Sequence, residues 1–94
     1  MNQPMDDAFA DRLRLHLRGM LEARQSLAKS LCPTEAAREI AVELKLEWRE
    51  LMRPIRHVAC ELVDQGAMEV IQDGVPVSLR DARGPVKFRL KQRR

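Results

Sequence analysis

The chain has 94 residues, of which 17 are Lys or Arg and 14 are Asp or Glu, so its formal net charge is +3. This length suits one domain and leaves no room for a second core. No apolar run approaches the roughly 20 residues that a membrane-spanning helix needs.

The composition also limits the class of protein. The N-terminus is polar and acidic, with no basic segment followed by an apolar one, which argues against a signal peptide. Two cysteines are too few for a disulfide framework and fit a reducing compartment. Two His, no Tyr and four scattered Gly offer little for catalysis. We therefore expect a cytoplasmic protein that is not an enzyme, does not associate with a membrane and carries no cofactor.

The basic charge is concentrated toward the C-terminus. Residues 1–47 have a net charge of −1, residues 48–94 a net charge of +4, and residues 74–94 a net charge of +6. A basic end on a small domain is typical of a protein that binds a polyanion. The alternative is that these side chains only keep a tail soluble.

Two helices are predicted in the first half. Residues 1–5 are expected to be flexible, and apolar residues at helical spacing predict a helix from Asp6 to Arg24. A loop with a very short strand near Ser30-Leu31 follows. The second helix begins at Cys32-Pro33, because proline is favoured in the first helical position, and ends near Lys45. Its outer surface is acidic, so it should not approach a nucleic acid; the carboxylates are Glu39, Glu43 and Glu47.

A third helix is predicted from Glu47 or Trp48 to just before Gly66. Gly66 suits the left-handed position that follows a helix. Leu51, Ile55, Val58 and Leu62 share one side of this helix on a helical wheel. Pro54 lies inside the segment and should kink it, unless the helix breaks at Met52-Arg53 and restarts at the proline.

Beyond Gly66 the apolar spacing changes from helical to alternating. Residues 68–71 predict a strand that ends at Asp73-Gly74, and residues 74–84 predict a loop. Val86, Phe88 and Leu90 then alternate with basic residues, which predicts a half-buried strand with a basic outer surface. Residues 91–94 form a basic tail.

The predicted order is helix, short strand, helix, helix, strand, loop, strand. It predicts an α+β fold, a winged helix over residues 6–90 with three helices and a small antiparallel β-hairpin wing. The alternative is a three-helix bundle with a frayed basic tail.

Three blocks of sequence carry a resemblance to a known family. They are residues 31–38 (LCPTEAAR), 48–52 (WRELM) and 83–86 (RGPV). The chain resembles a family of small bacterial proteins of unknown function that has an Ile-Cys-Pro-Ser-Glu, a Trp-Arg and a closing Arg-Gly-Pro block. Leu31 and Thr34 stand where that family more often has isoleucine and serine. The resemblance runs from about Ser30 to Leu90; it implies a winged-helix-like fold and no particular activity.

The strongest candidate site lies on the third helix. Arg49, Arg53 and Arg56 fall within about 60° of one another on the wheel, opposite the apolar side. In a winged helix this is the recognition helix, and arginine there binds guanine edges or phosphate. His57 flanks the arginines and adds a possible hydrogen bond. The alternative is a solvated helix surface whose ion-pair partners are Glu50, Glu61 and Asp64.

The predicted wing is the second candidate. Basic side chains on a wing meet the phosphates of a nucleic acid. The residues assigned to this role are Arg80, Arg83, Lys87 and Arg89. A metal site is not expected, because His57 and Cys60 are only two ligands and zinc needs about four. Cys32 is expected to be a small residue at a tight junction rather than a reactive thiol.

The function predicted from the sequence is nucleic-acid binding, with duplex DNA favoured as the partner. The alternative is a module of the same fold that binds a protein partner or associates with itself. That alternative exists because fold alone does not determine function. The acidic surface of the second helix favours it.

Overall fold

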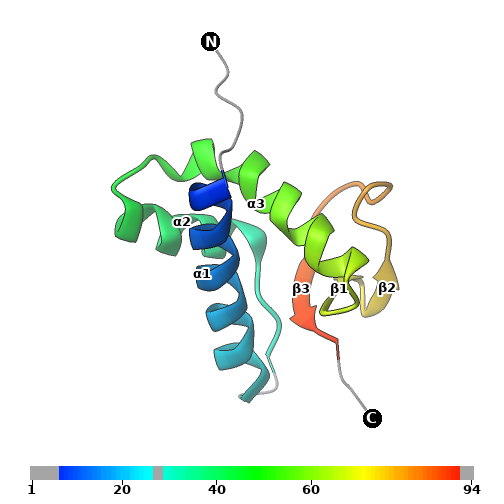
Figure 1. Ribbon diagram of the computed structural model, residues 1–94. Coiled ribbons are helices and arrows are strands. Elements are labelled where there is room, and N and C mark those ends of the chain that lie inside the picture. The colour runs from blue at the N-terminus through cyan, green and yellow to red at the C-terminus, as the bar shows by residue number, and fades with distance from the viewer. Residues whose placement is uncertain (1–6, 27–28, 92–94) are drawn as a thin grey trace.

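The computed structural model describes residues 7–26 and 29–91. Three helices are followed by a three-stranded antiparallel sheet; they are α1 (Asp7–Ser26), α2 (Pro33–Leu44), α3 (Trp48–Asp64), β1 (Met68–Gln72), β2 (Val75–Val77) and β3 (Lys87–Leu90). The sheet lies to one side of the helices and packs against α1 and α3 (Figure 1). This confirms the predicted α+β class, and the arrangement is compatible with a winged-helix-like fold. The predicted flexible segment 1–5, Asp6 and tail residues 92–94 lie outside the described residues.

The helix ends follow local signals in the sequence. Pro33 occupies the first position of α2, after Cys32 in extended conformation, as predicted. At the start of α3 the Glu47 amide donates to the Glu50 carboxylate at 3.2 Å, a capping contact that the sequence analysis did not use. At its end Gly66 has a φ of +75°, which confirms the predicted left-handed position. The amides of Gly66 and Ala67 return to the carbonyls of Val63 and Leu62 at 3.0 and 2.9 Å.

Pro54 does not divide α3. The helix is continuous from Trp48 to Asp64, so the predicted alternative of a break at Met52-Arg53 is wrong. A proline inside a helix costs about 3 kcal/mol, because it removes an amide donor and crowds the preceding turn. Burial of apolar side chains on both sides of the proline offsets that cost at roughly 1.5–3 kcal/mol each. These side chains are Leu51, Ile55, Val58 and Leu62.

The strands pair in the order β2-β1-β3. In the register of β1 with β3, Val70 lies opposite Phe88 and Glu69 opposite Arg89. On the other side of β3 a single bridge joins Phe88 to Leu31, with both backbone N–H to O distances at 2.8 Å. The short strand predicted near Ser30-Leu31 is therefore this one bridge. It ties the C-terminal strand to the segment that enters α2.

Strand β2 was not predicted, because residues 74–84 read as a loop. Asp73 and Gly74 have φ values of +53° and +81°, the conformation of a two-residue hairpin turn. This tight turn lets Val75–Val77 pair with β1. Only residues 78–86 form a loop, which returns the chain to β3 and is called the 78–86 loop below.

The core combines the apolar positions that the helical and alternating patterns marked with Leu31 and Leu79, which neither pattern marked. Phe88 is 1% exposed and is the aromatic residue buried most deeply in the described chain. Phe9 and Trp48, also expected in the core, are half-buried against it. The other large side chains under 2% exposed are Leu13, Leu17, Leu21, Leu31, Ile40, Leu51, Ile55, Val58, Leu62, Met68 and Val70.

Truncating Phe88 should test how far the fold depends on this side chain. We expect Phe88→Ala to lower the free energy of unfolding by about 3–5 kcal/mol, because it removes buried apolar area and leaves a cavity. Phe88→Leu keeps most of the volume and should cost about 1–1.5 kcal/mol. Leu15→Ala is the control, since Leu15 is 74% exposed. Urea unfolding measures all three, and similar losses for Phe88→Ala and Leu15→Ala would contradict the prediction.

Candidate functional site

The arginine face is formed by Arg49, Arg53 and Arg56 on the exposed side of α3. The buried side of the same helix faces the core, so the helical period alone directs these three side chains outward. None of the three forms an ion pair with a carboxylate within residues 7–26 and 29–91. The structure thus brings together the three arginines that the sequence predicted. The alternative partners Glu50, Glu61 and Asp64 are engaged elsewhere.

Trp48 extends the arginine face onto α2. The guanidinium carbon of Arg49 lies 4.7 Å from the centroid of the indole ring, and that of Arg38 lies 5.0 Å from it. Such cation–π contacts orient a guanidinium while leaving its N–H groups free to bind an anion. Arg38 was not predicted as a site residue, because only tertiary packing brings α2 beside the start of α3.

Two side chains attach the 78–86 loop to α3. Arg56 donates through Nη2 to the Leu79 carbonyl at 2.7 Å. Arg80 donates to both carboxylate oxygens of Asp64, at 3.0 and 3.3 Å. Leu79 is buried between these two contacts. These contacts hold the loop beside the C-terminal half of α3, and Arg49 and Arg53 take no part in them.

Ion pairing divides the remaining predicted site residues into two groups. Arg80 pairs with Asp64, and Arg89 pairs with Glu69 across β1 and β3 at 2.6 Å. His57 lies 4.0 Å from Glu61, whose two carboxylate oxygens both accept from Nη2 of Arg14 at 3.1 Å. By contrast, Arg83 and Lys87 are exposed and form no ion pair with the described part of the chain.

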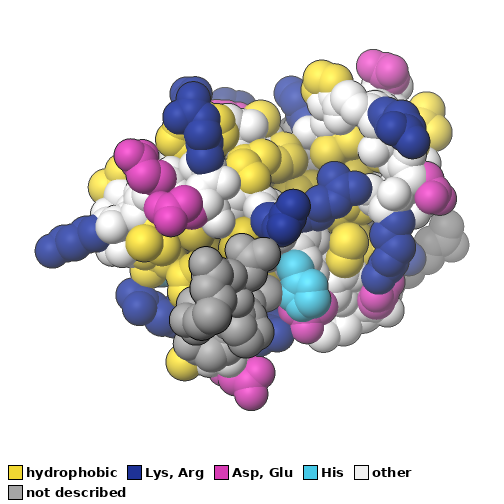
Figure 2. All heavy atoms as spheres, turned by 90° about the horizontal axis from the view of Figure 1, so that it is seen from above, with side chains coloured by type: hydrophobic (Ala, Val, Ile, Leu, Met, Phe, Trp, Pro, Cys, Tyr) yellow, Lys and Arg dark blue, Asp and Glu magenta, His cyan; other side chains and the backbone are white. Residues whose placement is uncertain are grey.

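Beside the arginine face lies a groove with a volume of about 450 Å³. Its walls come from the start of α2, from α3 and from the 78–86 loop with β3. The lining residues are Cys32, Pro33, Met52, Arg53, Ile55, Arg56, Leu79, Gly84, Pro85, Val86 and Phe88. Each of the three sequence blocks contributes to this lining: Cys32-Pro33, Met52 and residues 84–86. Seen from above, Lys and Arg side chains lie beside exposed hydrophobic side chains in the middle of the molecule, with carboxylates toward the edges (Figure 2).

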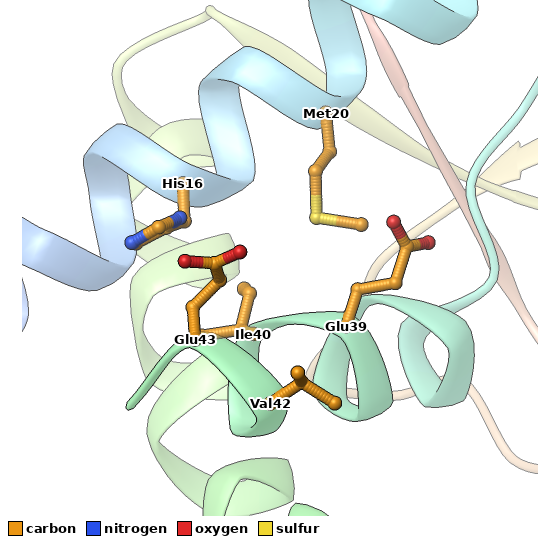
Figure 3. Close-up of a pocket in the computed structure, with 6 residues that line it drawn as sticks. All are labelled: His16, Met20, Glu39, Ile40, Val42 and Glu43. Atoms are coloured by element: carbon orange, nitrogen blue, oxygen red, sulfur yellow. The ribbon is translucent and has the colours of Figure 1, made fainter. Parts of the chain in front are cut away.

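A second groove, of about 600 Å³, lies between α1 and α2, and its lining includes carboxylates in place of arginines. His16 and Met20 project from α1 toward Glu39 and Glu43 of α2 (Figure 3). No cluster of three or more His, Cys, Asp or Glu side chains suited to a metal ion occurs in residues 7–26 and 29–91. Cys32 and Cys60 are free thiols and are half-buried. Among the described helices, none has the length and apolarity to cross a bilayer.

Comparison with known proteins gives one family match. The model of a family described as a protein of unknown function (DUF3253) matches residues 10–91. No curated protein matches the chain. The family match covers all three helices from Ala10 onward and the whole sheet.

The contact between Arg80 and Asp64 should make stability depend on pH. The hydrogen bond from Arg80 lowers the pKa of Asp64 below its ordinary value, and that of Arg80 rises in turn. Ionised Asp64 therefore stabilises the folded chain above the ordinary aspartate pKa of about 3.9. This contribution is lost as the pH falls through the lowered pKa of the folded state.

We expect the stability difference between the wild type and Asp64→Asn to be largest near neutral pH and to vanish in acid. Urea midpoints measured from pH 7 down to pH 2.5 will show the difference. Arg80→Gln should abolish it, since the cause of the lowered pKa is then absent. An unchanged pH dependence in Arg80→Gln would mean that this contact does not stabilise the fold.

Proposed function

The chain belongs to the DUF3253 family, whose function is unknown, and we propose that this protein binds duplex DNA through the arginine face of α3. In this proposal Arg49, Arg53 and Arg56 approach the major groove, where arginine binds guanine edges and phosphates. Arg83 and Lys87 contact the adjacent backbone. The function is one of binding, without a catalytic step.

The observation that carries the proposal is that no carboxylate of the described residues forms an ion pair with this surface. Arg49, Arg53 and Arg56 form no ion pair with a carboxylate of the described residues, although 14 Asp and Glu are present in the chain. Their seven-residue span covers roughly 10 Å of helix. That span fits the major groove, which is about 12 Å wide.

The surroundings of the arginine face support the same use. Trp48 holds Arg49 and Arg38 at its ring, which adds a fourth guanidinium beside the start of α3. The carboxylate of Glu50, the acidic residue within the first turn, is turned back to the Glu47 amide. Arg80 and Arg89 each have a carboxylate partner, so the proposal assigns the phosphate contacts of the wing first to Arg83 and Lys87.

Two double variants, each of which removes two arginines, will test the proposal. The double variant Arg49→Ala/Arg53→Ala should bind a fluorescent 20-base-pair duplex about tenfold more weakly, or weaker still, in low salt. Each of the two substitutions removes a contact with a phosphate or a base. The slope of log affinity against log salt should fall by about 2. Fluorescence anisotropy over a salt series measures both quantities.

The matched control is Arg12→Ala with Arg18→Ala, which removes the same charge from exposed positions of α1. It should leave affinity and salt slope nearly unchanged. Equal losses of DNA affinity in the two double variants would mean that binding depends only on the net charge of the protein. A wild-type chain that shows no salt-dependent binding to duplex DNA would refute the proposal.

A second candidate function is self-association through α2. Val42 is 78% exposed and lines the groove between α1 and α2, next to Glu39 and Glu43. An exposed apolar side chain that lines a groove offers a surface to a second chain, whereas one outside that groove, such as Leu15, is ordinary on a protein surface.

Light scattering coupled to size exclusion tests this candidate. If the chain forms a dimer through α2, the measured molar mass should equal two chains for the wild type and one chain for Val42→Lys. Leu15→Lys, which adds the same charge at an exposed position of α1, is the control. A wild-type mass of one chain at high concentration would reject this second candidate.

A further inference from the structure

The groove between α2, α3 and the 78–86 loop has the dimensions of a small-molecule site. Its volume of about 450 Å³ falls within the range of roughly 300–1,000 Å³ typical of ligand pockets. Most of its lining is apolar, and these side chains are Pro33, Met52, Ile55, Leu79, Pro85, Val86 and Phe88.

The walls of the groove are held in place by several independent contacts. Leu31, next to the lining residue Cys32, pairs with Phe88, and Arg56 donates to the Leu79 carbonyl. The side-chain amide of Gln72 donates to the carbonyls of Arg83 and Pro85, the latter at 3.3 Å. A site whose walls are already ordered loses little conformational entropy when a ligand binds.

The charged groups of the groove are both cationic. Arg53 and Arg56 are its charged lining residues, and no Asp or Glu of the described part of the chain lines it. Arg56 uses Nη2 for the Leu79 carbonyl, while Arg53 has no carboxylate partner among residues 7–26 and 29–91. Guanidinium groups bind carboxylates in a two-pronged geometry, and the contact strengthens beside an apolar wall that excludes water.

We propose that this groove binds an amphipathic monocarboxylate, with its apolar body against Met52, Pro85 and Val86 and its carboxylate on Arg53. Charge complementarity selects this class of ligand over an apolar molecule or an amine. An apolar ligand would leave Arg53 unused, and an ammonium group would be repelled by both guanidinium groups.

The inference has a regulatory consequence that rests on the proposed function. Arg53 and Arg56 belong to both the groove and the arginine face. A carboxylate bound there neutralises charge that DNA phosphates would otherwise contact. Occupation of the groove should therefore weaken binding to duplex DNA and lower its salt dependence.

The groove is tested without DNA, by titrating the ¹⁵N-labelled wild-type chain with octanoate below its micellar concentration. We expect saturable shifts of the backbone amides of Leu79, Gly84 and Val86, which border the groove. Octanol has an alkyl group of similar length and no charge, and it should bind about tenfold more weakly than octanoate. Octylamine should not bind.

Variants separate the role of charge from that of shape. Arg53→Gln should lower the affinity for octanoate severalfold and leave octanol binding unchanged, with Arg56 keeping a smaller preference for octanoate over octanol. The control Arg12→Gln, on the exposed surface of α1, should change neither the affinity for octanoate nor that for octanol. Equal affinities of the wild type for octanoate and octanol, shifts confined to residues outside the groove, or no saturable binding would overturn the inference.

The DNA measurement distinguishes this inference from the proposed function. Octanoate should weaken the wild type's binding to the fluorescent duplex, whereas octylamine should not. A chain that binds octanoate in the groove but binds no DNA supports the site and refutes the proposed function. A chain that binds DNA equally with and without saturating octanoate refutes the regulatory consequence.

Discussion

The pairing of Leu31 with Phe88 is the contact on which the rest of the structure depends. It joins the segment before α2 to the last strand, 57 positions later, through two hydrogen bonds of 2.8 Å. The next hydrogen-bonded pair of an antiparallel ladder would be Pro33 with Val86, but proline has no amide N–H to donate. Toward α2 the pairing therefore goes no further, Pro33 begins α2, and the two segments diverge. The groove lies where they separate.

Ion pairs then decide which basic side chains remain available. Arg14 of α1 binds Glu61 of α3, and this hydrogen bond raises the pKa of Arg14. Arg80 binds Asp64 near the end of α3, and Arg89 binds Glu69 across the sheet. These contacts pair the carboxylates of Glu61 and Asp64 on α3 and of Glu69 on the sheet, where Lys87 keeps no ion-pair partner among the described residues. The N-terminal half of α3 has no such contacts with the described residues, and there the arginine face and the groove meet.

Local signals predicted much of this architecture. The apolar spacing located all three helices, Gly66 marked the end of α3, and the alternation around Phe88 identified β3. Only the alternative of a break at Met52-Arg53 was wrong for α3, because burial of one continuous apolar side kept the helix intact through Pro54. The turn at Asp73-Gly74 was recognised as an end of β1 but not as a hairpin, so β2 was missed.

The helices, their caps and the outward side of α3 that bears Arg49, Arg53 and Arg56 follow from local sequence, because they depend on residues within a few positions of one another. The pairing of charges follows from tertiary packing. Arg80 reaches Asp64 and Arg14 reaches Glu61 across long stretches of chain, and the register of β1 with β3 places Arg89 opposite Glu69. The groove likewise depends on three segments that are distant in sequence. No local pattern encodes such contacts, since they exist only once packing has fixed the elements relative to one another.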